Sequence, residues 1–225
     1  MFFRTAWLVL RKDVAIEAKS WEVVTTTLFF AVACVLIFAF AFVKEGRPVE
    51  DAAAGILWIA IAFSGTLALG RTFERERYGE TLRALLLAPA PRAALYVGKL
   101  LGMLVLLAVA EALLVPMIAL LFQATLFSRP LLLAGLLAGG TLGFSAVGTL
   151  FAAMLVRARS RDVLLPVLLY PIIIPVIIAG VRGTAALLGA EPDEPTAIMW
   201  IGILAAFDAV FVTLALWTFE PLMTE

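Results

Sequence analysis

The chain has 225 residues, of which 64% are hydrophobic and only 15% are charged, and its mean hydropathy is +1.08. Soluble domains are near half apolar and about a quarter charged, so this composition excludes a disordered chain, a disulfide-stapled secreted module and an ordinary soluble enzyme. Seventeen basic and seventeen acidic residues cancel, which leaves no basic field to attract nucleic acid. We therefore predict an all-α integral membrane protein that folds as one domain over residues 1–225.

The sequence lacks the residues that most catalytic and metal chemistry requires. It has no histidine and a single cysteine, Cys34, so a His-based catalytic triad, a zinc site and an intrachain disulfide cannot be assembled. Its one Gly-Lys pair, Gly98-Lys99, is followed by Leu100 rather than by a phosphate-binding loop sequence. We predict that the chain is not an enzyme and binds no metal or cofactor, and that any ATP and Mg²⁺ are held by a partner subunit.

Residues 1–20 have the pattern of an amphipathic helix that lies in the headgroup region. One face of such a helix is apolar, and the basic side chains turn away from it. The apolar face consists of Phe3, Trp7, Leu10 and Val14. The apolar run is too short for a secretory signal, and the alternative to an interfacial helix is a frayed terminus. Trp21, at the entrance to the first membrane span, is predicted to be an interfacial anchor.

Six apolar stretches are long enough to cross a hydrocarbon core about 30 Å thick. They cover residues 22–43, 52–70, 100–122, 131–156, 163–180 and 197–219. Six spans place both termini on one side, and lysine and arginine counts indicate which side that is. With the N-terminus inside, the inner segments hold thirteen of these residues and the outer segments hold four. We predict a bacterial inner membrane protein whose two termini are cytoplasmic.

The cytoplasmic segment 71–99 is predicted to contain a short helix between two charged stretches. Gly79 interrupts a charged run, and three leucines then recur with the spacing of one helix face. They are Leu82, Leu85 and Leu86. Pro89 ends this helix, and Pro91 is placed to start the next one. Because so short a helix is marginal in water, it needs a partner surface, either the headgroups or another protein.

Two carboxylic acids fall near the middle of membrane spans, Glu111 in the third and Asp208 in the sixth. A central acidic residue costs about 2.5–3.5 kcal/mol on insertion scales and normally faces the bundle interior. Each is expected to be protonated and hydrogen-bonded to a hydroxyl or a carbonyl group. Two interpretations stay open, namely a structural hydrogen bond between helices and a polar pathway through the membrane.

Small residues at four-residue spacing mark the fourth span. They are Gly135, Gly139 and Gly143. Such a pattern lets another helix backbone approach closely, and a smooth helix could also slide during a conformational change. We predict helix packing here.

Three prolines mark the fifth span, Pro166, Pro171 and Pro175. Each removes a backbone donor and clashes with the preceding turn. The helix should therefore be bent or locally unwound and should face the bundle interior, acting either as a hinge or as a static kink.

The loop sequence resembles that of a known family. Residues 76–89, followed by Gly98-Lys99, resemble the cytoplasmic loop of six-span ABC-2 type permeases. Segments 55–74, 139–150 and 163–180 are similar to one branch, the CcmB family of permease-like subunits of the cytochrome c maturation system I, called the haem exporter. The resemblance covers roughly residues 1–220.

This resemblance implies a coupling helix and a set of partners. In that family the loop helix docks into a groove on an ATPase, and the matching residues here are Gly79, Glu80, Thr81, Leu82, Leu85, Leu86 and Pro89. The implied partners are an ABC ATPase subunit (CcmA-like), a haem-handling membrane subunit (CcmC-like), a small single-span subunit (CcmD-like) and a periplasmic haem chaperone (CcmE-like). The ATP cycle would then drive haem export or release of the haem-loaded chaperone.

The absence of histidine favours a mechanical role over haem binding by this chain. Axial ligation would have to use Met, Tyr or Cys34, none of which lies in a recognisable haem motif. Three alternatives remain: an ABC-2 exporter of a lipid, glycan or drug, a proton-coupled carrier that uses Glu111 and Asp208, and a scaffold without transport.

Overall fold

The computed structural model describes residues 2–44, 47–48, 52–72, 91–156, 158, 160–188 and 191–222. The described helices are α1 (Phe2–Ser20), α2 (Glu22–Ala41), α3 (Ala53–Thr72), α6 (Arg92–Phe122), η2 (Leu126–Ser128, a 3-10 helix), α7 (Pro130–Met154), α8 (Arg161–Ala185) and α9 (Glu194–Leu222). Between α2 and α3, the two-residue strands β1 (Val43–Lys44) and β2 (Arg47–Pro48) pair in antiparallel fashion.

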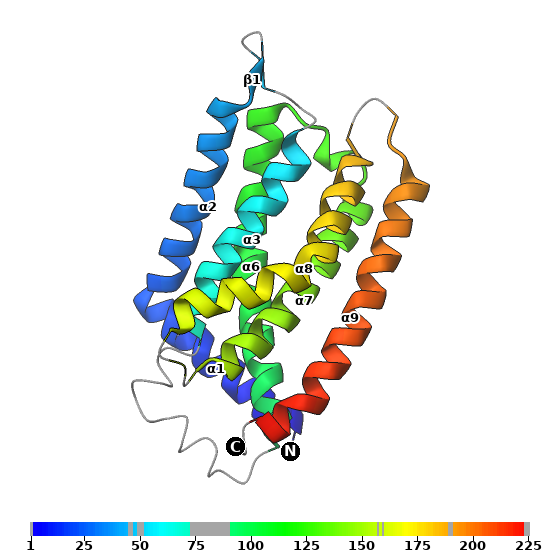
Figure 1. The fold of residues 1–225 in the computed structure, drawn as a ribbon. Coiled ribbons are helices and arrows are strands. Elements are labelled where there is room, and N and C mark those ends of the chain that lie inside the picture. Colours follow the sequence, from blue (N-terminus) through cyan, green and yellow to red (C-terminus); the bar gives the residue numbers. More distant parts are fainter. Residues whose placement is uncertain are drawn as a thin grey trace.

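Six of these helices are long and apolar enough to cross a membrane, which confirms the six predicted spans. They contain 20 to 31 residues, and a helix of 20 residues is about 30 Å long, the thickness of the hydrocarbon core. The helices stand side by side in one bundle (Figure 1), with α1 and the last turns of α9 at one end and the β1–β2 hairpin at the other. An even number of crossings returns the chain to the side from which it started.

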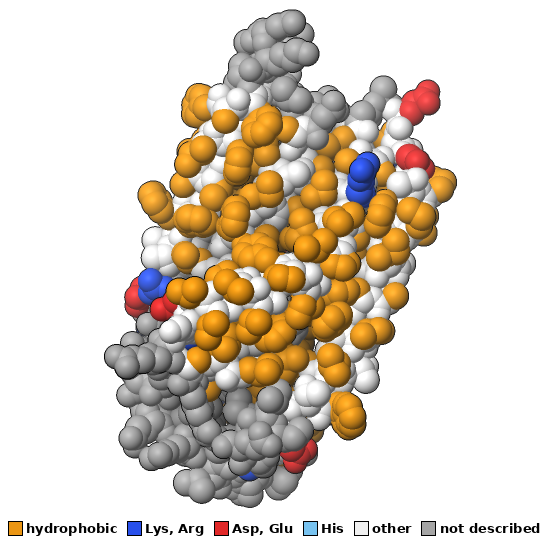
Figure 2. All heavy atoms as spheres, in the orientation of Figure 1, with side chains coloured by type: hydrophobic (Ala, Val, Ile, Leu, Met, Phe, Trp, Pro, Cys, Tyr) orange, Lys and Arg blue, Asp and Glu red, His pale blue; other side chains and the backbone are white. Residues whose placement is uncertain are grey.

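The bundle is built around α3 and α7, which bury more than half of their apolar stretches, whereas α2 and α9 lie on the outside and bury little. In the view of Figure 2, hydrophobic side chains cover the middle of the molecule, and the described charged side chains lie toward its two ends. A soluble protein would not expose so large an apolar surface. The distribution is that of a bundle whose outer surface faces lipid.

Helix α1 precedes the first span as a separate helix that packs on the start of α6. Ala6 and Val9 form its buried face, and Gly98 of α6 permits the approach, since a Cβ atom there would lie 2.6 Å from Val9 Cβ. Most of the predicted apolar stripe points elsewhere, and Phe3 and Trp7 are 85% and 61% exposed. A largely exposed apolar face suits a helix at the lipid interface.

Trp21 alone joins α1 to α2 and adopts a left-handed backbone conformation, with φ of 52°. Its amide donates a hydrogen bond to the carbonyl of Glu17 at 2.7 Å, which closes α1, and its carbonyl accepts one from Thr25 at 2.9 Å, which opens α2. A bulky residue rarely has positive φ. The one-residue corner therefore turns the chain sharply from α1 into the first span.

Helix α8 is helical throughout, although three prolines lie inside it. Figure 1 shows that it bends about half-way along its length. The predicted bend is confirmed, and local unwinding is not observed. One face of α8 packs on α3, α7 and α9, while Val163, Val167 and Ile174 stay exposed on the other face, so only part of this helix faces the bundle interior.

Candidate functional site

The seven residues predicted to form the coupling helix lie outside the residues that the structure describes. They are Gly79, Glu80, Thr81, Leu82, Leu85, Leu86 and Pro89. The structure does describe the two helices that flank this segment. Helix α3 ends at Thr72, and α6 begins at Arg92, directly after Pro91 as predicted.

A buried lysine connects these two ends. Lys99 follows Gly98 in α6, about two turns after the start of the helix, and is only 5% exposed. Its ammonium donates to the carbonyl of Thr72 at 2.9 Å and pairs with Asp13 of α1 at 3.0 Å. Lys12 also pairs with Asp13, at 3.1 Å. The end of α3, the start of α6 and α1 therefore meet at one charged group.

A second buried cation reaches the same end of α3. Arg161, at the first residue of α8, is 3% exposed, and it donates to the carbonyl of Leu69 at 2.9 Å. The last four carbonyls of a helix have no partner within the helix and carry partial negative charge. Lys99 and Arg161 thus satisfy two of the four such carbonyls of α3, each from a different helix.

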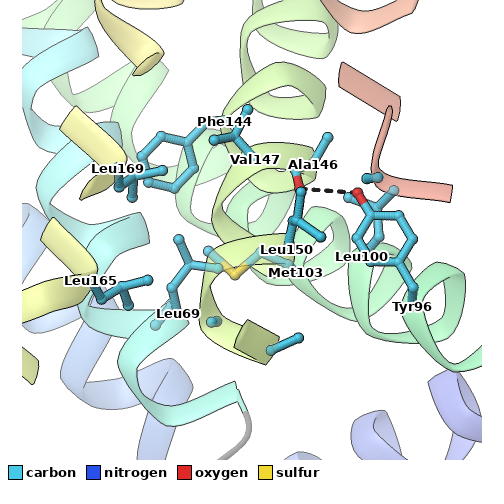
Figure 3. Packing of buried hydrophobic residues seen from close by; sticks show 14 of the residues in the cluster. Leu69, Tyr96, Leu100, Met103, Phe144, Ala146, Val147, Leu150, Leu165 and Leu169 are labelled. Atoms are coloured by element: carbon cyan, nitrogen blue, oxygen red, sulfur yellow. Dashed lines mark hydrogen bonds between the residues drawn. The ribbon is translucent and has the colours of Figure 1, made fainter. Parts of the chain in front are cut away.

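Tyr96 fixes the first turns of α6 against α7. It is fully buried, and its hydroxyl donates to the carbonyl of Ala146 at 2.9 Å (Figure 3). Figure 3 also shows Leu69 of α3 and Leu165 of α8, which lie across Met103 and Leu150 from Tyr96. We refer to Asp13, Thr72, Tyr96, Lys99 and Arg161 as the loop base.

Glu111 of α6 is buried, with 8% of its surface exposed, and it accepts a hydrogen bond from the Thr141 hydroxyl of α7. Both residues line a groove of about 740 Å³ between α6 and α7. The predicted partner for this acid, a hydroxyl on a neighbouring helix, is present.

Asp208 of α9 is equally buried, at 7% exposure, but its environment differs from the prediction. Its Oδ1 has no hydrogen-bond partner among the described residues. The carboxyl group lies against the glycine face of α7, where a Cβ atom on Gly143 would stand 2.7 Å from Oδ1. A buried acceptor without a partner costs about 1–3 kcal/mol, so packing alone does not explain this residue.

The two acids lie at one level of α7 but on opposite sides of it. Thr141, which contacts Glu111, is two residues from Gly139 and from Gly143, which face Asp208. Two residues turn an α-helix by about 200°. The structure therefore places α7 between Glu111 and Asp208 instead of bringing the two carboxyl groups together.

The three predicted packing glycines all face α9. A Cβ atom on Gly135 would lie 3.1 Å from Ile201, and one on Gly139 would lie 3.1 Å from Leu204. With Gly143 against Asp208, the stripe forms a flat strip along which α9 lies close to α7. The pattern in the sequence identified the strip but not the helix that covers it.

The sequence analysis missed a tryptophan in the centre of the bundle. Trp58 of α3 is 1% exposed, and its Nε1 donates to the Thr184 hydroxyl of α8 at 2.9 Å. Its ring lies against Gly140 of α7 and Gly180 of α8, where an added Cβ atom would come within 3 Å of the indole. One signal was available: Trp58 lies inside a predicted span, more than one helical turn from its start, whereas tryptophan prefers the membrane interfaces.

Fold and loop base together define an integral membrane protein of six spans, in which the end of α3 is bound by buried cations from α6 and α8. Comparison with known proteins specifies the class further. The family model described as CcmB protein matches residues 4–221. The chain therefore belongs to the CcmB family, as its resemblance had indicated.

Bacterial relatives named "Heme exporter protein B" agree with this assignment. The protein of Pseudomonas aeruginosa is 27% identical over 199 residues, which cover 88% of each chain. The protein of Paracoccus denitrificans is 34% identical over 167 residues, which cover 73% of this chain and 75% of the relative. The protein of Rhodobacter capsulatus is 28% identical over 201 residues, which cover 88% and 90%.

Proposed function

We propose that this chain is the membrane subunit of an ABC transporter-type complex for c-type cytochrome biogenesis. In this proposal it couples ATP hydrolysis by a separate ATPase subunit to a conformational change that exports haem or releases a haem-loaded periplasmic chaperone. The observation that carries the proposal is the CcmB family match over residues 4–221. The names of the relatives support haem export. We place the chain in a bacterial inner membrane with both termini in the cytoplasm, because of the lysine and arginine bias.

The loop base supports a mechanical route from the cytoplasm into the membrane. A force on segment 73–90 acts on Thr72 at one end and on α6 at the other, and Lys99 holds these two ends together. Arg161 extends the connection to α8, the bent helix. A displacement of the loop is therefore passed to α3, α6 and α8 as a unit. ATP can shift this arrangement only by favouring one position of the loop over another.

Assembly with the ATPase provides the direct test. We expect Leu85→Asp and Glu80→Lys each to lower the amount of co-purified ATPase subunit by about tenfold or more, because interfaces depend on a few buried contacts. The measurement is pull-down of the tagged chain from membranes that also contain the partner subunits, with insertion checked by membrane fractionation.

Matched controls lie at the other end of the bundle. Leu131→Asp makes the same change at a residue that is 86% exposed, and Glu191→Lys reverses a charge at another exposed site. Both should retain the ATPase subunit. If the two loop variants retain it as well, the coupling contact is not at this segment. If the unaltered chain recovers no ATPase subunit, the proposed function is wrong.

The different surroundings of the two intramembrane acids lead to different expectations. Glu111→Gln keeps an oxygen that can accept from Thr141, so the free energy of unfolding should change by no more than about 0.5 kcal/mol and cytochrome c assembly should persist. Asp208→Asn replaces an ionisable group whose Oδ1 has no partner among the described residues with a neutral amide of the same size. It should not lower the free energy of unfolding, yet it should reduce cytochrome c assembly, as expected of a residue kept for function at a cost in stability.

Chemical denaturation in mixed micelles and haem staining of c-type cytochromes measure the two effects. Thr141→Val is the control for the Glu111 contact, because it removes the donor from a buried acceptor and should cost about 1–3 kcal/mol. Normal assembly in Asp208→Asn, together with a loss of stability, would make Asp208 a structural residue.

A further inference from the structure

A cavity lies beside the loop base and shares Asp13, Thr72 and Lys99 with it. It has a volume of about 440 Å³ and is enclosed by α1, α2, α3 and α6. Val105 and Val109, on its α6 wall, are 46% and 45% exposed. The cavity is therefore accessible from the lipid-facing side of the bundle.

The cavity has the depth of one leaflet. Its α6 wall extends from Lys99 to Val109, ten residues that rise by about 15 Å along a helix. The hydrocarbon core is about 30 Å thick, so this wall covers about half of it. Between these two residues the wall consists of small and apolar side chains, including Gly102 and Leu106. A chain of methylene groups fits such a wall.

The mouth of the cavity is charged. Among the described residues it is lined by three cations, Lys12, Arg71 and Lys99, and by two carboxylates, Asp13 and Glu17. Lys99 and Asp13 are engaged in the loop base, whereas the ammonium of Lys12 and the guanidinium of Arg71 lie nearer to solvent. The mouth therefore places two accessible cations next to the apolar wall of the cavity.

The position of the mouth agrees with the headgroup level of a bilayer. Trp21, a residue type enriched at membrane interfaces, lines it and is 61% exposed. Arg71 pairs there with Glu22 at 2.8 Å. Exposed ion pairs of this kind contribute little stability, so a phosphate group can compete for the arginine.

We propose that this cavity binds an anionic membrane phospholipid, with one acyl chain along α6 and the phosphate at Lys12 and Arg71. The acyl chain fills the space between the interfacial helix α1 and the spans, and the lipid phosphate competes with Asp13 and Glu22 for the exposed cations Lys12 and Arg71. This proposal rests on the fold and not on the proposed function, so the two can fail independently.

Two glycines of membrane helices provide a matched test. A Cβ atom on Gly102 would meet nothing within 4 Å, so Gly102→Leu should fold and fill the cavity from its α6 wall. A Cβ atom on Gly202 of α9 likewise meets nothing, and that residue is exposed away from the cavity. Gly202→Leu is therefore the control.

The full-length chain is reconstituted in vesicles of equal parts phosphatidylglycerol and phosphatidylcholine, extracted in mild detergent and examined by native mass spectrometry. The unaltered chain and Gly202→Leu should retain one phosphatidylglycerol per chain, and Gly102→Leu should retain about tenfold less, because the displaced acyl methylenes lose their burial. The Lys12→Gln, Arg71→Gln double variant removes two cations and should lose a preference of about 25-fold for phosphatidylglycerol, about fivefold for each cation near a membrane surface.

Three outcomes would overturn the proposal: no retained phospholipid on the unaltered chain, equal retention by Gly102→Leu and Gly202→Leu, or no preference between the two headgroups. Retention of detergent alone at this stoichiometry would also overturn it. Loss of ATPase binding in any of these variants tests the proposed function only. The lipid proposal is tested by the retained phospholipid alone.

Discussion

Replacing Trp58 with alanine should lower the free energy of unfolding by about 3–5 kcal/mol, the range for removing a large buried aromatic side chain. The indole fills the space where α3, α7 and α8 meet, and its hydrogen bond to Thr184 is buried. The variant leaves both a cavity and an unpaired hydroxyl. Denaturation in mixed micelles, followed by circular dichroism, measures the loss.

The glycines around Trp58 allow the same packing to be tested by adding a methyl group instead of removing the indole. Gly180→Ala places a methyl group within 3 Å of the indole and should cost about 1–3 kcal/mol through overpacking. In the Trp58→Ala background the same methyl group enters vacated space, so the two losses should not add, with a coupling of about 0.5–3 kcal/mol.

Gly202→Ala is the control for the change from glycine to alanine in a membrane helix. Its new methyl group meets nothing within 4 Å, and alanine favours a helix over glycine by about 1 kcal/mol, so its stability should be unchanged or higher. Equal effects of Gly180→Ala and Gly202→Ala would contradict the close contact at Trp58.

Replacing Lys99 with methionine should cost about 3 kcal/mol, the lower end of the range for breaking a buried ion pair by removing one partner. The lower end applies because Asp13 keeps 24% of its side chain exposed and retains its pair with Lys12. The variant also leaves the carbonyl of Thr72 without this donor. We expect α1 to detach first, which hydrogen exchange of its amides would report as lost protection.

Arg71→Met is the control for Lys99→Met. It removes a positive charge at the same end of α3 but leaves the buried interactions of Lys99 in place. It breaks the exposed pair with Glu22 and should cost no more than about 1 kcal/mol. The double variant Asp13→Asn, Lys99→Met should lose less stability than the sum of the losses of the two single variants, because both remove the same contact. Similar costs for Lys99→Met and Arg71→Met would show that Lys99 does not hold the loop base together.

The sequence alone was sufficient to predict the six spans, because the thickness of the bilayer sets the number of consecutive apolar residues that a crossing needs. It also predicted the start of α6 after Pro91 and the bend of α8, since proline acts on its own turn of helix. These features depend on residues that are neighbours along the chain.

The candidate site could be predicted only in part. The sequence placed Glu111 and Asp208 at mid-span, but it could not reveal that α7 separates them, that Thr141 serves one of them, or that Asp208 lies against a glycine strip. The sequence singled out Lys99 as part of the family-like Gly98-Lys99 pair, but nothing in it indicated that this lysine is buried, because lysines at a membrane boundary normally extend toward water. Its burial depends on Asp13 and Thr72, which α1 and α3 bring to it from distant parts of the sequence.

Which residues cross the membrane was thus decided by the local sequence, whereas the neighbours of each helix were decided by tertiary packing. Lipid tails are as apolar as leucine, so burial of apolar surface does not by itself pair one membrane helix with another. Pairing depends on close-fitting contacts, such as Trp58 between Gly140 and Gly180, and on a few buried polar interactions, such as those of Lys99 and Arg161 with the end of α3. Such contacts join residues far apart in the chain, and no local pattern records them.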